Sequence, residues 1–244
     1  MFDRKKYKDF AKKQLKGRWT TPVLVTLFCS IITSLFATPD IINDLSENFS
    51  AIMAASENAY SSELIFESVF SPALVYIFRV LSIISLFIVF VLTIAQIYLY
   101  LKMSKGPQPV KFSDFIDGFS LWGRGILGGL WIYLWTFLWA LLFIIPGIIK
   151  SYAYSQTLYL LAEYPELSVT KAMKVSIEIT KGKKGSLFIM DLSFIGWAIL
   201  AAISLGIGYL WLVPYINMTK TNAYHGMLKD AVTEGRIKEE DLRG

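Results

Sequence analysis

Four polar residues toward the C-terminal end of the sequence are candidates for proton or ion chemistry within apolar stretches. Asp191 interrupts the apolar stretch 186–204, and Asn217, Lys220 and Asn222 belong to the stretch that follows it. A carboxylate at membrane depth is expected to be paired or protonated, because water does not solvate its charge there. We therefore expect Asp191 to contact Lys220 or Asn217. Such a contact either locks two helices together or takes part in a proton or ion relay.

Two isolated basic residues, Arg79 and Lys150, are candidates for anion or lipid-headgroup contacts. Tyr152 and Tyr154 belong with them, because they start a polar run directly after Lys150 that is unusual in a lipid-facing helix. Long basic side chains in a membrane extend to the headgroups or pair with protein groups. In the other interpretation, Arg79 and Lys150 flank a cavity that attracts an anionic group such as a lipid phosphate.

The composition is that of a membrane protein. The chain has 244 residues, of which 55% are hydrophobic and 18% are charged, and its mean hydropathy is +0.50. A soluble domain carries about 25% charged residues and could not bury this much apolar surface. The single Cys excludes a disulfide framework, and the single His excludes a histidine-based metal cluster. We expect an all-α, polytopic membrane protein with one membrane domain over residues 1–244.

Six apolar stretches are candidates to cross a bilayer, which takes about 20 residues in a helix. They are 20–37, 73–101, 122–145, 148–162, 186–204 and a sixth that ends near residue 228. Pro146-Gly147 is the expected turn between the third and fourth stretches. The sixth begins either after a turn at Gly206-Ile-Gly208 or at Pro214. A reading with four spans, in which the third or fourth stretch is re-entrant, fits the charges less well.

The basic residues predict the orientation. All Lys and Arg except Arg79 and Lys150 lie before the first stretch, between the second stretch and the first turn of the third, between the fourth and fifth, or near the C-terminal end. The segment 38–72 has acidic residues and no basic one. Because positively charged loops stay in the cytoplasm, we expect six transmembrane helices with both termini in the cytoplasm.

The six stretches form three hairpins, each preceded by a segment with the pattern of an amphipathic surface helix. We expect one repeat at 1–103 with an outer insertion at 38–72, a second at 107–165, a third at 166–230, and a polar cytoplasmic tail at 231–244. Each surface helix is followed by a basic corner with glycine: Lys16-Gly-Arg-Trp19, Trp122-Gly-Arg-Gly125 and Lys181-Gly-Lys-Lys-Gly185. Alternatively, such corners are simply common at membrane boundaries. The insertion 38–72 is either a solvated loop or an outer helix that serves as a gate or partner epitope.

Recognisable catalytic machinery is absent from the sequence. There is no glycine-rich phosphate loop, no His-Glu-x-x-His and no Gly-x-Ser-x-Gly. We expect no enzyme activity, no catalytic residue, no metal and no cofactor. The basic, aromatic N-terminal segment has features of a nucleic-acid binder, but a helix on the membrane surface explains it more simply. We expect no nucleic-acid partner.

Several long segments resemble one bacterial family. They are 11–19, 138–152, Leu161-Ala-Glu-Tyr-Pro-Glu-Leu-Ser168, Asp191-Leu-Ser-Phe-Ile-Gly-Trp197, Leu205-Gly-Ile-Gly208 and Val213-Pro-Tyr-Ile-Asn217. Together they resemble the bacterial integral-membrane domain-of-unknown-function family 975, which is distantly similar to the membrane domain of some glycerophosphodiester phosphodiesterases. The resemblance implies a multi-pass protein of the bacterial cytoplasmic membrane. It supplies no activity and no catalytic residue.

Two function classes follow. The first is a non-catalytic membrane module that engages membrane lipids, a membrane-protein partner or a second copy of itself. The second is a small transporter or channel with a polar cavity near Lys150, Asn217 and Asp191. A continuous water-lined path between these three residues would favour transport, whereas a dry core with lipid in lateral grooves would favour the module.

Overall fold

The computed structural model describes residues 2–36 and 72–243, without the side chains of 72–75 and 77–79. Every regular element in this part of the chain is a helix, which confirms the all-α expectation. The chain divides into two compact units, one formed by Met1–Leu27 with Phe90–Gly244 and one formed by Phe28–Val89. The contacts and cavities described below lie within the first unit.

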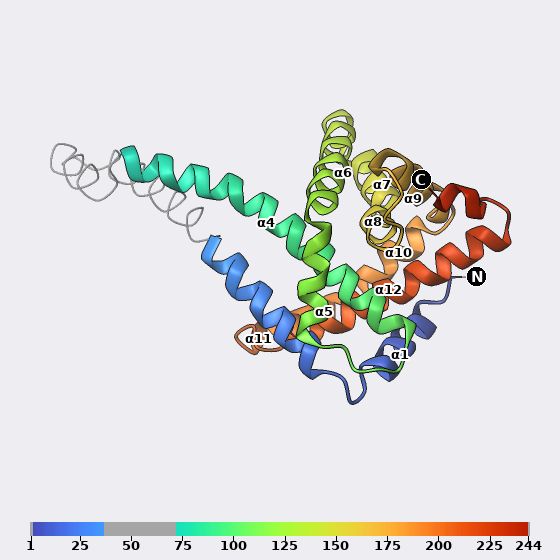
Figure 1. Ribbon diagram of the computed structural model, residues 1–244, viewed down its shortest axis with the longest axis horizontal. Helices are drawn as coiled ribbons and strands as arrows, with labels where there is room; N and C mark the ends of the chain where they lie inside the picture. The colour runs from blue at the N-terminus through green and yellow to red at the C-terminus, as the bar shows by residue number, and fades with distance from the viewer. Residues whose placement is uncertain (1, 37–71, 244) are drawn as a thin grey trace. The chain divides into compact units, whose positions relative to one another are not determined.

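Within each described range, the helices follow one another with short connections (Figure 1). They are α1 (Arg4–Leu15), an unlabelled helix (Thr20–Phe36), α4 (Pro72–Lys105), α5 (Phe112–Asp117), η1 (Gly118–Leu121), α6 (Trp122–Leu142), α7 (Ile144–Tyr154), α8 (Thr157–Glu163), α9 (Val169–Ile179), α10 (Lys184–Leu192), α11 (Ile195–Ile203), α12 (Tyr209–Thr233) and η2 (Glu239–Leu242).

Within the described residues, three helical segments are long and apolar enough to cross a membrane. They are Val80–Lys105, Phe112–Leu142 and Lys184–Ile203, and a fourth candidate is α1 together with Thr20–Phe36, which are bent by 101°. The expected fourth span is divided into α7 and α8 by a break at Ser155 and Gln156. The expected sixth span, α12, is 25 residues long but carries several polar side chains. The structure therefore supports three to four of the six expected spans.

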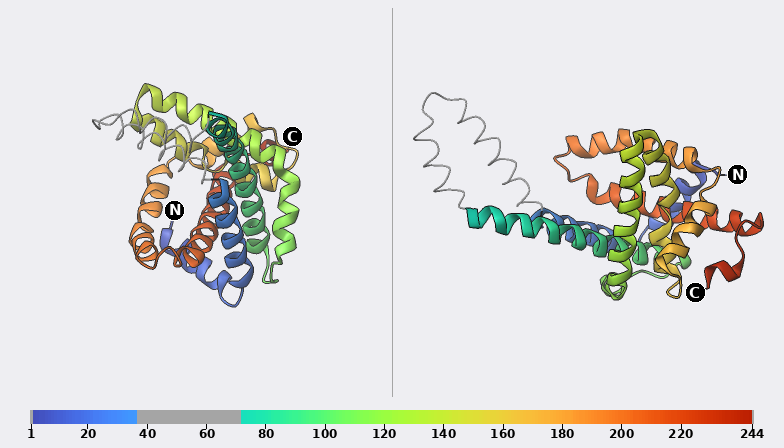
Figure 2. Two further views of the ribbon diagram at one scale, coloured as in Figure 1. Left: turned by 90° about the vertical axis from the view of Figure 1, so that its left-hand side faces the viewer. Right: turned by 90° about the horizontal axis from the view of Figure 1, so that it is seen from above.

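The predicted turn at Pro146-Gly147 is wrong. The chain turns at Phe143, which has extended backbone angles, and α7 already begins at Ile144. Pro146 lies in the first turn of α7, where its missing N–H breaks no hydrogen bond. Gly147 permits close packing instead, because a Cβ at this position would lie 2.8 Å from Cα of Ala140 on α6. Figure 2 shows α6 and α7 side by side.

Of the two predicted starts for the sixth helix, the one after Gly206-Ile-Gly208 is confirmed. Helix α12 begins at Tyr209 and contains Pro214 in its interior. Leu205 and Gly206 both have positive φ angles, of 55° and 85°. This left-handed backbone is easy for glycine and unusual for leucine, and it turns the chain from α11 into α12.

The core joins helices that are distant in the sequence. Helices α4, α8, α9 and α12 share one apolar cluster, which includes the fully buried Ile94, Leu160, Ile179 and Tyr224. Helix α1 packs along α12 (Figure 2). The apolar face of α9, predicted to lie in the headgroup layer, is packed against protein. A second apolar cluster joins Leu187 and Met190 of α10 to α12, with Tyr152 of α7 packed against it, so α7, the end of α10 and α12 lie close together.

Candidate functional site

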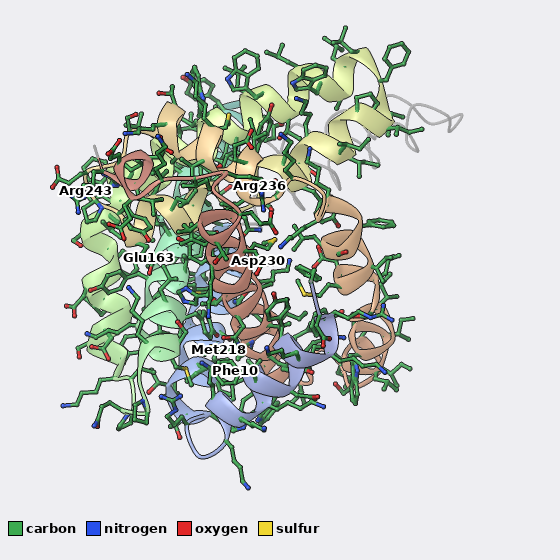
Figure 3. All side chains as sticks on the ribbon, turned by 90° about the vertical axis from the view of Figure 1, so that its right-hand side faces the viewer. Phe10, Glu163, Met218, Asp230, Arg236 and Arg243 are labelled. Carbon is green, nitrogen blue, oxygen red and sulfur yellow. The ribbon has the colours of Figure 1, made fainter. Side chains whose placement is uncertain are left out.

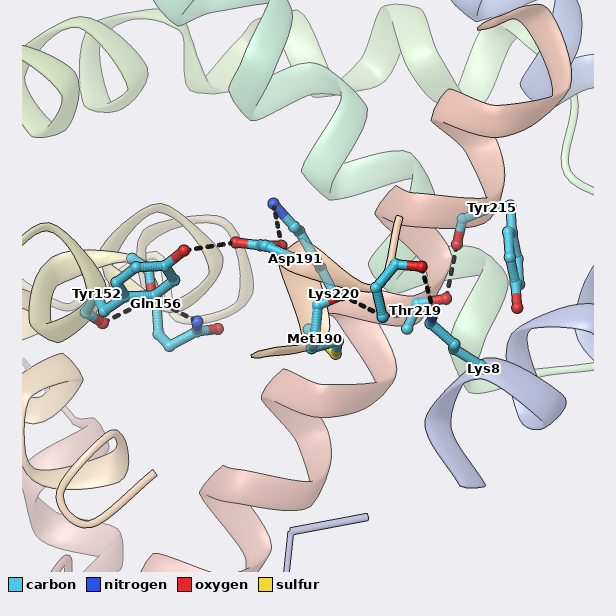
Figure 4. A network of polar contacts seen from close by, with 10 residues as sticks. Lys8, Tyr152, Gln156, Met190, Asp191, Tyr215, Thr219 and Lys220 are labelled. Carbon is cyan, nitrogen blue, oxygen red and sulfur yellow. Dashed lines mark hydrogen bonds and ion pairs between the residues drawn. The ribbon is translucent and has the colours of Figure 1, made fainter. Parts of the chain in front are cut away.

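Asp191 connects three helices near the end of α10. Its Oδ1 lies 3.2 Å from Nζ of Lys220 on α12, and its Oδ2 accepts a hydrogen bond of 3.1 Å from the hydroxyl of Tyr152 on α7 (Figure 4). The Asp191 and Lys220 side chains are 35% and 41% exposed, so the ion pair is accessible from outside. Asp191 thus contacts Lys220, one of the two partners expected from the sequence. Tyr152 is an additional partner of Asp191.

The two asparagines of α12 have different partners from those expected. Asn217 Nδ2 donates to Oε1 of Gln96 on α4 over 3.2 Å. Asn222 Nδ2 donates to Oε1 of Gln14 on α1 over 2.8 Å. Asn217 thus lies beside the Asp191 group without a direct bond to it, whereas Asn222 ties α12 to the N-terminal helix.

The break between α7 and α8 is stabilised from α9. Ser176 donates to the carbonyl of Ala153 over 2.7 Å and accepts from the backbone N–H of Gln156 over 3.1 Å. The Ala153 carbonyl and the Gln156 N–H, which an unbroken helix would pair internally, are thus hydrogen-bonded to the Ser176 hydroxyl. The Gln156 side chain donates through Nε2 to Ser155 Oγ over 2.7 Å. Its Oε1 is buried and has no hydrogen-bond partner.

These groups surround a cavity of about 260 Å³, which we call the polar cavity. It is lined by Thr93, Gln96, Ile97, Tyr100, Tyr152, Ser155, Gln156, Leu158, Tyr159, Leu187, Met190, Asp191, Asn217 and Lys220. The volume is slightly below the range of about 300–1,000 Å³ that small-molecule pockets occupy. The polar cavity therefore has room for a few waters or a small solute, and it offers both signs of charge.

The remaining predicted site residues do not line the polar cavity. Lys150 Nζ lies 4.5 Å from the centre of the Trp139 ring, a cation–π contact. Tyr154 is buried in a cluster with Ala153 and Met173. The Arg79 side chain and residues 38–71 of the expected insertion 38–72 lie outside the described part of the structure. The expected path from Lys150 to Asn217 and Asp191 is therefore not formed by these lining residues.

A second, more open depression of about 480 Å³ is mainly apolar, and we call it the tryptophan groove. It is lined by Lys12, Trp19, Trp197, Leu200, Ala201, Ser204, Gly208, Trp211, Leu212 and Tyr215. Lys12 provides its cation and lies 5.7 Å from the centre of the Tyr215 ring. One helical turn away, Lys8 donates to the carbonyl and hydroxyl of Ser193, where α10 and α11 separate.

In each of the three expected hairpins, a basic residue that follows a glycine contacts another part of the chain. These contacts lie at the ends that are expected to be cytoplasmic. Arg18 donates to the carbonyls of Gly106 and Gln108, just after α4. Arg124 donates to four carbonyls at the end of α8, those of Leu161, Tyr164, Pro165 and Leu167. Lys183 pairs with Asp230, which lies near the C-terminal end of α12 (Figure 3). This ion pair lowers the pKa of Asp230, chiefly through the hydrogen bond from Lys183.

The match to a protein-family model covers residues 1–150 and 131–231. The family is described as a protein of unknown function, DUF975. This chain belongs to the DUF975 family. No curated protein and no solved structure matches the sequence, so the site of this DUF975 chain is interpreted from its own geometry.

Sequence reasoning on the DUF975 chain missed Gln96 and placed Gln156 only within the polar run that follows Lys150. Neither side chain is charged, so neither stands out as a costly charge within an apolar helix. An amide side chain within an apolar helix could have identified both residues, because a buried amide requires a hydrogen-bond partner just as a buried charge does. Within the described residues, no group of three His, Cys, Asp or Glu side chains is suitable for a metal ion.

Proposed function

We propose that this DUF975 protein is a non-catalytic, multi-pass protein of the bacterial cytoplasmic membrane that engages anionic lipid. The proposal includes six spans and cytoplasmic termini. Helix α12 supports it by its length, since 25 residues extend over about 37 Å. The break between α7 and α8 is compatible with a span, because Ser176 satisfies backbone groups there.

The tryptophan groove is the observation that carries the lipid proposal. Its apolar wall suits one acyl chain, and Lys12 supplies a cation for a phosphate. Lys8 and the exposed Lys5, Lys6 and Lys13 lie on the same helix. Basic side chains at an anionic membrane surface contribute about 1 kcal/mol each. The complementary occupant is therefore a phospholipid with a negatively charged headgroup.

The exposed surface adds independent support for a membrane location. The tip between α6 and α7 has Leu141, Phe143 and Ile144 each more than 70% exposed. The tip between α11 and α12 exposes Ile203 and Leu205 in the same way. Apolar patches of this kind are rare on monomeric soluble proteins, and lipid covers them in the proposed arrangement.

Lipid retention tests the proposal directly. The full chain is purified in a mild detergent, offered phosphatidylglycerol or phosphatidylcholine, and examined by native mass spectrometry. We expect retention of phosphatidylglycerol, reduced by Lys12→Ala and by Trp211→Ala but not by Lys16→Ala, a control at the C-terminal cap of the same helix. Equal retention of both lipids, or equal loss in the control, would contradict the groove. A stoichiometric dimer or a co-purified membrane protein without lipid would favour a partner-engaging role instead.

Cysteine labelling tests the topology. The native Cys29 is buried, so single cysteines can be introduced against a low background. We expect a membrane-impermeant maleimide added to whole cells to label Ile145→Cys and Ile207→Cys, at the two hairpin tips, and not Lys181→Cys. Labelling of Lys181→Cys alone would reverse the orientation, and labelling of none of the three would argue against exposed outer tips.

The polar cavity supports transport as a second candidate function. Asp191 and Asn217 both line it, and buried charges at membrane depth are typical of substrate paths. Reconstituted vesicles of phosphatidylglycerol and phosphatidylcholine, loaded with a radiolabelled solute, would show carrier-dependent release if this candidate is correct. Release unaffected by Asp191→Asn would count against it.

A further inference from the structure

The polar cavity contains an ion pair that has not used all its hydrogen-bonding capacity. An ammonium has three donors and a carboxylate has about four acceptor positions. Lys220 Nζ contacts Asp191 Oδ1, and Asp191 accepts from Lys220 and Tyr152. Both charged groups therefore keep free positions on a wall of the same cavity (Figure 4).

Gln156 provides a third, unused group. The Ser155 hydroxyl donates its only hydrogen to the carbonyl of Tyr152 over 2.8 Å, so it can only accept from the Gln156 amide. This fixes Nε2 on Ser155 and leaves Oε1 without a partner, although Gln156 is 95% buried. Buried acceptors are nearly always satisfied. A molecule that donates a hydrogen bond within the cavity would satisfy this one.

The charges select the class of that molecule. Asp191 and Lys220 lie 3.2 Å apart and sum to zero, so a ligand with one charge is attracted by one group and repelled by the other. A ligand that carries both charges can bind both groups without separating them. The volume of about 260 Å³ corresponds to roughly nine waters at about 30 Å³ each, which suits a small solute.

We propose that the polar cavity binds a small zwitterion with one ammonium and one carboxylate, of the size of a free amino acid. The ammonium of the ligand donates to Asp191 and to Gln156 Oε1. The carboxylate of the ligand accepts from Lys220. The aliphatic part of the ligand packs against Ile97 and Leu158. This site is independent of the tryptophan groove, so failure of the lipid proposal leaves it intact.

Calorimetric titration of the full chain in detergent micelles tests the ligand class. The probes are alanine and leucine, compared with propionate and ethylammonium, which each lack one charge of alanine. We expect saturable binding of at least one amino acid and binding at least about tenfold weaker for both single-charge analogues, the factor that one charge-assisted hydrogen bond supplies. Equal binding of an analogue, or no saturable binding of either amino acid, would overturn the proposal.

A pair of neighbouring variants tests the position of the site. Gln156→Leu removes the unused acceptor, and we expect it to weaken amino-acid binding about tenfold. Thr157→Val is the control, because the Thr157 hydroxyl is also buried without a partner but does not line the cavity. Unchanged binding in Gln156→Leu, or an equal loss in Thr157→Val, would refute the assignment. The comparison of ligands with the unmodified chain does not depend on either variant.

Discussion

The guanidinium of Arg124 and the ion pair of Asp191 and Lys220 show two different uses of charge in one helical bundle. Arg124 donates to four backbone carbonyls at the end of α8. Asp191 and Lys220 are each more than one third exposed and lie beside an acceptor with no partner. Arg124 has four of its five N–H donors engaged by backbone carbonyls, whereas the ion pair retains capacity for a further molecule.

This difference separates a structural charge from a candidate binding charge. A charged group whose hydrogen bonds are complete stabilises the fold, and its removal leaves several backbone groups unsatisfied. A partly exposed ion pair contributes little to stability, so another role is needed to explain its place beside a cavity. The variants below test whether the two regions respond as differently as this reasoning requires.

Replacement of Arg124 should have the largest effect. We expect Arg124→Ala to lower the free energy of unfolding by about 3 kcal/mol, because carbonyls at the α8 end lose their donor. Arg124→Lys should recover only part of this loss, since an ammonium cannot reproduce the planar fork of donors. Thermal unfolding in detergent measures both variants. If Arg124→Ala left the free energy of unfolding unchanged, the contrast between Arg124 and Asp191 would be contradicted.

The α6–α7 contact should respond nearly as strongly. We expect Gly147→Ala to cost about 2 kcal/mol, because its Cβ would lie 2.8 Å from Ala140 and overpacking is destabilising. Gly123→Ala is the matched control on α6, since nothing lies within 4 Å of its added Cβ. Equal unfolding temperatures for both variants would show that the two helices adjust freely.

Asp191→Asn should have a small effect on stability. We expect a loss of about 0.5 kcal/mol, typical of a partly exposed pair, together with a clear loss of amino-acid binding if the cavity proposal is correct. Unfolding curves and titrations of the same sample measure the two effects. A stability loss as large as that of Arg124→Ala would make Asp191 a structural residue.

The smallest expected effect is a pH dependence from Asp230. Its pKa is lowered in the folded chain by the hydrogen bond from Lys183, so the stabilisation is present above the unfolded-state pKa. It is lost as the pH falls through the lowered pKa. We expect Asp230→Asn to be less stable than the unmodified chain at neutral pH, with the difference shrinking on acidification. A difference independent of pH would contradict this linkage.

Sequence reasoning succeeded where one physical requirement dominated. The apolar composition predicted helices that could cross a membrane, and three such segments lie within the described residues. The cost of an isolated carboxylate predicted a partner for Asp191, and Lys220 lies beside it. Of the two starts predicted for the sixth helix, the one after the two glycines around Ile207 is the start of α12. Each of these predictions depends on the residue types and spacing within one segment of the chain.

The failures concern contacts made across the sequence. Pro146-Gly147 resembles a turn, but Pro146 fits a first helical turn and Gly147 is required by Ala140 on another helix. The break at Ser155 depends on Ser176, which lies on α9. Gln96 and Gln156 are candidate site residues only because α4, α7 and α12 come together around the polar cavity that both side chains line. None of these partners is visible from local spacing.

The packing of α1 on α12 has a consequence for biosynthesis. The hydroxyl of Tyr7 occupies the space that a side chain at position 226 would need, and Gln14 bonds to Asn222, 208 positions later. Because a chain is made from its N-terminus, α1 is synthesised long before its docking surface exists. A ribosome-bound intermediate must keep the Ala11 and Leu15 face of α1 covered by lipid or a chaperone until α12 emerges.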